Sequence, residues 1–167
     1  MGTVTDGDRR EGGGCLRSRC PFDRDRSEGG GRVRRKLARS YFGEAERALA
    51  RGDFRSCAAS SQLAAENAAK AIIALFGVLS CSHDPSPELE EVIRELLLEL
   101  REKAGRVAEI AHELAPEHGR AVYGEPTVGP TPWDLYDEAT ARRLLERARE
   151  AVELAEEMLE RLLGDRD

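Results

Sequence analysis

Residues 51–76 read RGDFRSCAASSQLAAENAAKAIIALF, and this stretch decides the fold. Gly52 ends the helical pattern before it, and Asp53 is a good N-cap because its carboxylate can accept hydrogen bonds from free N–H groups. Gly77 supplies the stop, so the stretch predicts one long helix. Its apolar and small residues recur at steps of three and four, which places them on one core-facing stripe: Phe54, Ala58, Ser61, Ala65, Ala68, Ile72 and Phe76.

The same predicted helix is unusually rich in small residues. Small side chains let neighbouring helices approach near the short end of the ~8–10 Å packing range, which favours a tight bundle. Aromatic residues make up only 5% of the 167-residue chain, whereas alanine, leucine, glutamate and arginine dominate. That composition is typical of an all-α domain. The small residues concerned are Ala58, Ala59, Ser60, Ser61, Ala64, Ala65, Ala68 and Ala69.

Two further helical regions follow. Ser86 is a candidate N-cap with Pro87 at the first helical position, and residues 86–115 predict two helices or one helix kinked at Gly105. The final helix is expected at about 137–163 and is ~40 Å long at 1.5 Å per residue. Its length is comparable with the ~36 Å of the helix predicted from the opening stretch. Matched lengths favour an up-and-down antiparallel four-helix bundle with one additional short or kinked helix.

The domain limits follow from composition. Residues 1–31 are rich in glycine, arginine, aspartate and serine, without periodic apolar residues, and are expected to be a disordered or mis-assigned tail. Residues 32–164 form the predicted bundle, and 165–167 a short tail. The block 32–55 carries eight basic and three acidic residues. This excess of positive charge indicates either a solvated helix face or a surface that contacts phosphates or an acidic partner.

A polar line runs along the helix of the opening stretch. Gln62, Glu66 and Lys70 stand four residues apart, with Glu66 before Lys70 in the favourable order. Taken alone, the spacing indicates a solvated face with an exposed ion pair worth ~0.3–0.5 kcal/mol.

Together with Asp53-Phe54-Arg55, this line resembles the second helix of HEPN domains (higher eukaryote and prokaryote nucleotide-binding), which carries Q-x-x-x-E-x-x-x-K. Three further matches follow in the family's order. His83 lies in the connection before the third helix, residues 120–126 (RAVYGEP) resemble the family's R-Y-P-like turn, and residues 136–139 (YDEA) resemble the entry to its last helix. The resemblance covers about Arg32 to Leu163 and implies a stand-alone prokaryotic member.

Candidate binding residues lie in two places. The resemblance points to Gln62, Glu66, Lys70 and Arg120. The connection 121–136 is long for a compact domain, and such connections often carry binding elements. Its aromatic residues could stack a nucleobase, worth ~1–3 kcal/mol per base, or could simply pin the connection onto the bundle. They are Tyr123, Trp133, which is the only tryptophan of the chain, and Tyr136.

One candidate catalytic pair exists. Ribonuclease members of the family resembled here use an arginine followed, after four to six residues, by a histidine, and Arg106 and His112 match that spacing. Val107 stands where the active motif usually has a polar residue. Six residues on a regular helix place two side chains ~120° apart, so catalysis would need a local break, which Gly105 could provide.

No metal or cofactor is predicted. His112 and His118 are six residues apart, not the four expected of paired helical ligands, and Cys15 and Cys20 lack a second ligand pair nearby. The sequence contains no P-loop, G-x-S-x-G or H-E-x-x-H motif. A disulfide between Cys57 and Cys81 is left open, since many charged residues and few amides suggest a thermophilic source.

Two functions remain as hypotheses. In the first, the chain is a non-catalytic, homodimeric interaction or nucleotide-binding module, which the family resemblance would pair with a small nucleotidyltransferase in a toxin–antitoxin-like system. In the second, it is a toxin that cleaves RNA without metal through Arg106 and His112. Either could bind a nucleotide or RNA. No uncharged stretch reaches the ~20 residues of a membrane span, so a cytoplasmic protein is expected.

Overall fold

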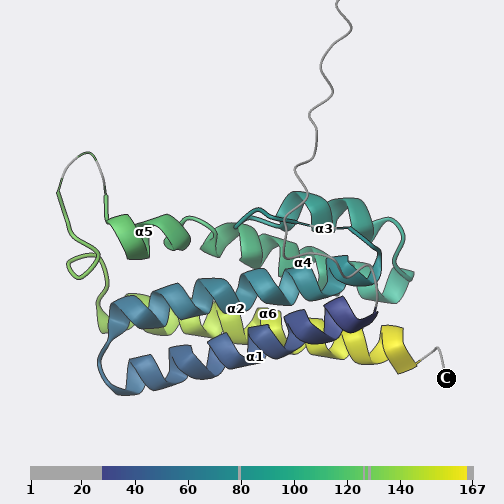
Figure 1. Ribbon diagram of the computed structural model, residues 1–167, viewed down its shortest axis with the longest axis horizontal. Coiled ribbons are helices and arrows are strands. Elements are labelled where there is room, and N and C mark those ends of the chain that lie inside the picture. Colours follow the sequence, from purple (N-terminus) through teal and green to yellow (C-terminus); the bar gives the residue numbers. More distant parts are fainter. Residues whose placement is uncertain (1–27, 79, 126, 128, 165–167) are drawn as a thin grey trace, which may run out of the picture.

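The computed structural model describes residues 28–78, 80–125, 127 and 129–164. These residues form helices and no strand, so the predicted all-α class is confirmed. The four long helices lie side by side along the length of the molecule, and the two short ones lie toward its opposite ends (Figure 1). The helices are α1 (Glu28–Ala50), α2 (Phe54–Leu75), α3 (Ser86–Ile93), α4 (Leu98–Leu114), α5 (Glu117–Tyr123) and α6 (Glu138–Gly164).

The central helix is α2, the one predicted from residues 51–76. Asp53 caps it by accepting a hydrogen bond from the Ser56 N–H at 3.1 Å, and Gly77 adopts a φ of +69° just beyond its end. α2 contacts each of the other five helices. Its alanines are buried except for Ala59, which is partly buried, and α1 approaches so closely that a Cβ on Gly31 would lie 3.2 Å from the carbonyl oxygen of Ala71. The predicted close packing around α2 is therefore present.

The region 86–115 forms two helices, but the break is not at Gly105. Helix α4 continues through that glycine, and the chain instead turns between α3 and α4, at residues 94–97. Arg101 stabilises the turn by donating hydrogen bonds to the carbonyl oxygens of Arg94 and Leu96, at 3.0 and 3.1 Å. Glycine costs a helix only about 1 kcal/mol relative to alanine, and the buried residues on either side of Gly105 outweigh that cost.

Two predicted boundaries shift by a few residues. Ser86 is the first residue of α3 and not its cap: its N–H and hydroxyl donate to the Asp84 carboxylate, at 3.1 and 2.6 Å. The predicted tail 1–31 is helical over its last four residues, because α1 begins at Glu28. The remainder of that tail and the tail 165–167 lie outside the described residues.

The cysteine and membrane expectations can be compared with the described part of the chain. Cys57 is buried and Cys81 exposed, and neither forms a disulfide. Cys15 and Cys20 lie outside the described residues. None of the described helices combines the length and the apolar character that crossing a bilayer requires.

Candidate functional site

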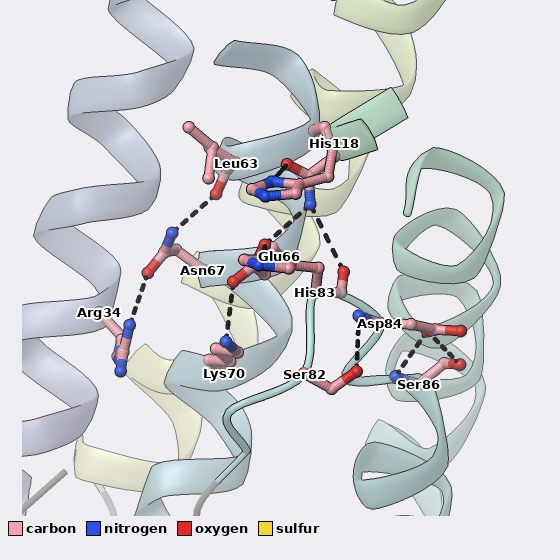
Figure 2. A network of polar contacts seen from close by, with 11 residues as sticks. Arg34, Leu63, Glu66, Asn67, Lys70, Ser82, His83, Asp84, Ser86 and His118 are labelled. Atoms are coloured by element: carbon pink, nitrogen blue, oxygen red, sulfur yellow. Dashed lines mark hydrogen bonds and ion pairs between the residues drawn. The ribbon is translucent and has the colours of Figure 1, made fainter. Parts of the chain in front are cut away.

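The polar line of α2 lies in the interior of the protein. Gln62, Glu66 and Lys70 are 1%, 5% and 7% exposed, so the prediction of a solvated face was wrong. The face is covered because the connection between α2 and α3 and the short helix α5 pack over it, bringing His83 and His118 to the line (Figure 2). These five residues are called the α2 polar cluster below.

Glu66 is the centre of the α2 polar cluster. One carboxylate oxygen accepts a hydrogen bond from the Lys70 ammonium at 2.8 Å, and the other accepts one from the Gln62 amide at 2.8 Å. The Nδ1 atom of His83 lies 3.1 Å from that second oxygen. Burial alone would raise the pKa of Glu66, but the hydrogen bonds and the charge of Lys70 outweigh it and lower the pKa. The cluster therefore holds an ionised, fully hydrogen-bonded carboxylate.

The two histidines of the cluster stack face to face. Their ring centroids are 3.4 Å apart and the ring planes differ by 14°. The Nδ1 atom of His118 lies 3.4 Å from the Gln62 side-chain oxygen, and since the Gln62 nitrogen already donates to Glu66, His118 is the donor in this contact. Burial, followed by the charge of His83, lowers the pKa of His118 and favours its neutral form.

The cluster also contains metal-ligating atoms. One atom each from Glu66, His83 and His118 lie within 4.8 Å of one another. Sequence spacing gave no indication of this group, because its members come from α2, from the following connection and from α5. Of the three, the resemblance singled out Glu66 and His83, whereas His118 was considered only as a helical neighbour of His112.

A second buried network surrounds Glu117 on α5. Arg120 donates hydrogen bonds to Glu117 at 3.0 Å and to Glu125 at 2.7 Å, and the Tyr136 hydroxyl donates to the Glu117 carboxylate at 2.5 Å. Burial, together with the Glu117 carboxylate, raises the pKa of Tyr136. Because the Tyr136 ring is buried, it ties the connection before α6 to α5, and it cannot offer a face to a nucleobase.

The other two predicted aromatic residues are exposed. Tyr123 is 78% and Trp133 73% exposed. The Arg55 guanidinium lies over the Trp133 ring, 5.3 Å from its centroid, and donates a hydrogen bond to the Ala121 carbonyl oxygen at 2.7 Å. Arg55, Tyr123 and Trp133 are called the aromatic end below. The sequence pointed to the two rings but gave no indication that Arg55 contacts Trp133. Arg55 had been considered only as part of the Asp53-Phe54-Arg55 run.

Arg106 and His112 contact separate carboxylates. The Arg106 guanidinium donates two hydrogen bonds to Glu150 on α6, at 2.6 and 3.0 Å, and one to Glu109 at 3.1 Å. The Nδ1 atom of His112 lies 2.7 Å from an Asp84 carboxylate oxygen. Since α4 is continuous between them, the two side chains stand ~120° apart around its axis. The break that would bring them together within one chain is not present in α4.

The family assignment rests on more than the α2 pattern. A sequence model of the HEPN domain matches residues 32–161, which include α2, the connection with His83 and most of α6. No curated protein and no solved structure shows significant similarity to the chain. The match covers well over half of the sequence and agrees with the all-helical fold and with the order of the motifs. The chain therefore belongs to the HEPN domain family.

Proposed function

We propose that this protein is a non-catalytic binding module that recognises a nucleotide or single-stranded RNA through the aromatic end. Membership in the HEPN family supports a nucleotide- or RNA-related role. The observation that carries the proposal is the exposure of Tyr123 and Trp133, with Arg55 against the Trp133 ring. Exposed rings and an arginine are the groups on which proteins stack unpaired bases.

The non-catalytic part of the proposal rests on the environment of Arg106. An arginine that contacts a scissile phosphate needs free N–H donors, but three of the donors of Arg106 are directed at Glu150 and Glu109. His112 lies on another side of α4 and pairs with Asp84. These contacts favour a structural role for the pair over ribonuclease chemistry.

The proposal also includes the assembly. The packing of α1, α2, α4 and α6 supports an up-and-down antiparallel four-helix bundle. The family resemblance supports a homodimer and, as a further partner, a small nucleotidyltransferase of a toxin–antitoxin-like pair. Light scattering of the purified protein would measure the dimer, and co-purification with a nucleotidyltransferase encoded beside it would measure the second association.

Tryptophan fluorescence tests the binding site directly, because Trp133 is the only tryptophan. We expect saturable quenching when a short single-stranded RNA or ATP is added. Tyr123→Ala should weaken binding roughly 5- to 150-fold, the equivalent of ~1–3 kcal/mol of lost stacking. Leu98→Ala is the matched control: Leu98 is equally exposed but begins α4, toward the opposite end of the molecule from α5 (Figure 1). Absence of quenching at millimolar ligand would contradict the proposal.

A ribonuclease assay in EDTA tests the alternative function. Structured and unstructured RNA would be incubated with the wild type and with His112→Ala. We expect no cleavage by either protein. Cleavage by the wild type that is lost in His112→Ala would overturn the non-catalytic proposal and establish the Arg106–His112 pair as an active site.

A further inference from the structure

We propose that Glu66, His83 and His118 form a binding site for a transition-metal dication such as Zn²⁺. This site goes beyond the proposed nucleotide or RNA binding, and it shares no residue with the aromatic end. One carboxylate and two imidazoles are a ligand set that suits zinc and leaves a fourth position for water. Their potential ligand atoms already lie within 4.8 Å of one another.

Part of the site has the geometry of a metal centre. Zinc–ligand distances of about 2.0–2.2 Å place neighbouring ligand atoms of a tetrahedral site roughly 3.3 Å apart. The Glu66 oxygen and the His83 Nδ1 atom are 3.1 Å apart, close to that separation. The His83 side chain is 53% exposed, so an ion can reach the site from solvent.

The surroundings of the ligands also fit a metal site. Gln62 donates a hydrogen bond to the Glu66 oxygen that faces His83, and its own oxygen lies beside the His118 ring. Such contacts from outside the ligand set fix the orientation of the ligating side chains. Gln62 is almost completely buried, so these contacts belong to the packed interior of the protein.

The histidine stack sets the movement that binding requires. Imidazole lone pairs lie in the ring plane, and two nearly parallel rings 3.4 Å apart cannot both direct a lone pair at one ion. One ring must turn when the ion binds. His83 lies in the connection between α2 and α3 and is exposed, so it has the space to turn, whereas His118 lies on α5, is partly buried and contacts the buried Gln62.

Lys70 weakens the site by its charge. Its ammonium lies 2.8 Å from the other oxygen of Glu66, so an ion at the His83 side shares the carboxylate with an existing cation. Asp84, next to His83 in the chain, is engaged by Ser86 and His112. A site with this charge balance should bind zinc more weakly than a structural zinc site, and removing the lysine charge should strengthen binding.

Imidazole ¹⁵N NMR of the full chain during zinc titration tests the proposal, because the chain contains only three histidines. We expect the nitrogen signals of His83 and His118 to shift together while those of His112 stay in place. His118→Ala should lower zinc affinity by at least about tenfold, measured by calorimetry. The variant leaves the Glu66–Lys70 pair intact. His112→Ala, which also removes one histidine, is the matched control and should bind zinc as the wild type does.

Three outcomes would overturn the proposal. They are the absence of shifts at millimolar zinc, shifts confined to His112, and unchanged affinity in His118→Ala. Lys70→Met provides a second measurement. Tighter zinc binding by this variant supports an ion at Glu66, and unchanged affinity in folded Lys70→Met places the ion elsewhere, for instance on cysteine thiolates. Loss of zinc binding would leave RNA or nucleotide quenching of Trp133 unaffected, so the two proposals fail separately.

Discussion

The α2 polar cluster and the facing surfaces of α4 and α6 use the same kinds of charged groups in opposite environments. In the α2 polar cluster, the side chains of Glu66 and Lys70 are 6% and 8% exposed. In the pair between α4 and α6, those of Glu150 and Arg106 are 38% and 35% exposed. Both pairs have short hydrogen bonds. Since both pairs have similar contact distances, we expect the difference in burial to decide how much each pair matters for stability.

The physical reason is the cost of removing a charge from water. An exposed pair gives up little hydration and contributes about 0–1 kcal/mol. A buried pair loses much hydration when it forms, and its attraction roughly offsets that loss, so its net contribution is near zero. Removing one partner of a buried pair is strongly destabilising, because the remaining charge then stays buried without a partner. The buried cluster should therefore be sensitive to single substitutions and the α4–α6 surface tolerant of them.

The largest effect is expected for Glu66→Gln. The substitution leaves the Lys70 ammonium buried without its counter-ion, and the free energy of unfolding should fall by about 3–5 kcal/mol. Urea denaturation followed by circular dichroism measures the change. The double variant Glu66→Gln/Lys70→Met should recover much of the loss, because it removes the unpaired charge as well. A loss below about 1 kcal/mol would mean that the buried pair behaves like an exposed one.

A smaller loss is expected for Tyr136→Phe. This change removes the hydroxyl that donates to the buried Glu117 carboxylate and should cost about 1.5–3 kcal/mol of unfolding free energy. Tyr123→Phe is the matched control, since the Tyr123 side chain is largely exposed and loss of its hydroxyl should change stability very little. Equal effects of the two substitutions would show that the Glu117 network does not depend on Tyr136.

The cluster should also make stability depend on pH. The folded pKa of His118 lies below its ordinary value of 6.5, so its contribution is complete above pH 6.5 and is lost as the pH falls toward the folded pKa. Glu66, with a pKa below 4.5, adds a second loss at lower pH. Thermal unfolding between neutral pH and pH 5 should show a falling midpoint in the wild type and a flatter profile in His118→Gln. A profile unchanged by that substitution, or flattened equally by His112→Gln, would contradict this assignment.

The smallest effect is expected for Arg106→Gln. The half-exposed pair with Glu150 should contribute less than about 1 kcal/mol, and this contribution should shrink further as salt is added. Urea denaturation at low and high salt measures both quantities. A loss as large as that of Glu66→Gln would remove the contrast between the two regions.

Local sequence signals predicted the core of the fold correctly. The Gly52-Asp53 start of α2 depends on the hydrogen bond between Asp53 and Ser56, and its end depends on the positive φ of Gly77, so both involve only residues at or next to the helix ends. The break between α3 and α4 could not be predicted in the same way. Gly105 carried the strongest local signal, but the buried residues around it keep the helix intact, and the turn occurs at residues with no breaker among them.

The candidate sites were predictable only in part. The family resemblance pointed to Gln62, Glu66, Lys70 and His83 as candidates, and the length of the connection 121–136 pointed to its aromatic residues, Trp133 among them. The stacking of His118 on His83 and the contact of Arg55 with Trp133 join residues far apart in the chain. Such contacts depend on how α5 and the connections pack against α2, and no periodicity within one helix records that packing.

The sequence by itself determined an all-helical protein, the limits of its central helix and its membership in the HEPN family. Helix periodicity and caps depend on residues close together in the chain, and the order of the motifs can be read directly along it. The tertiary structure decided which face of α2 is covered. The polar line predicted to be solvated is therefore a buried cluster. The 3.6-residue repeat determines which side chains share a face of the helix, but not what packs against that face.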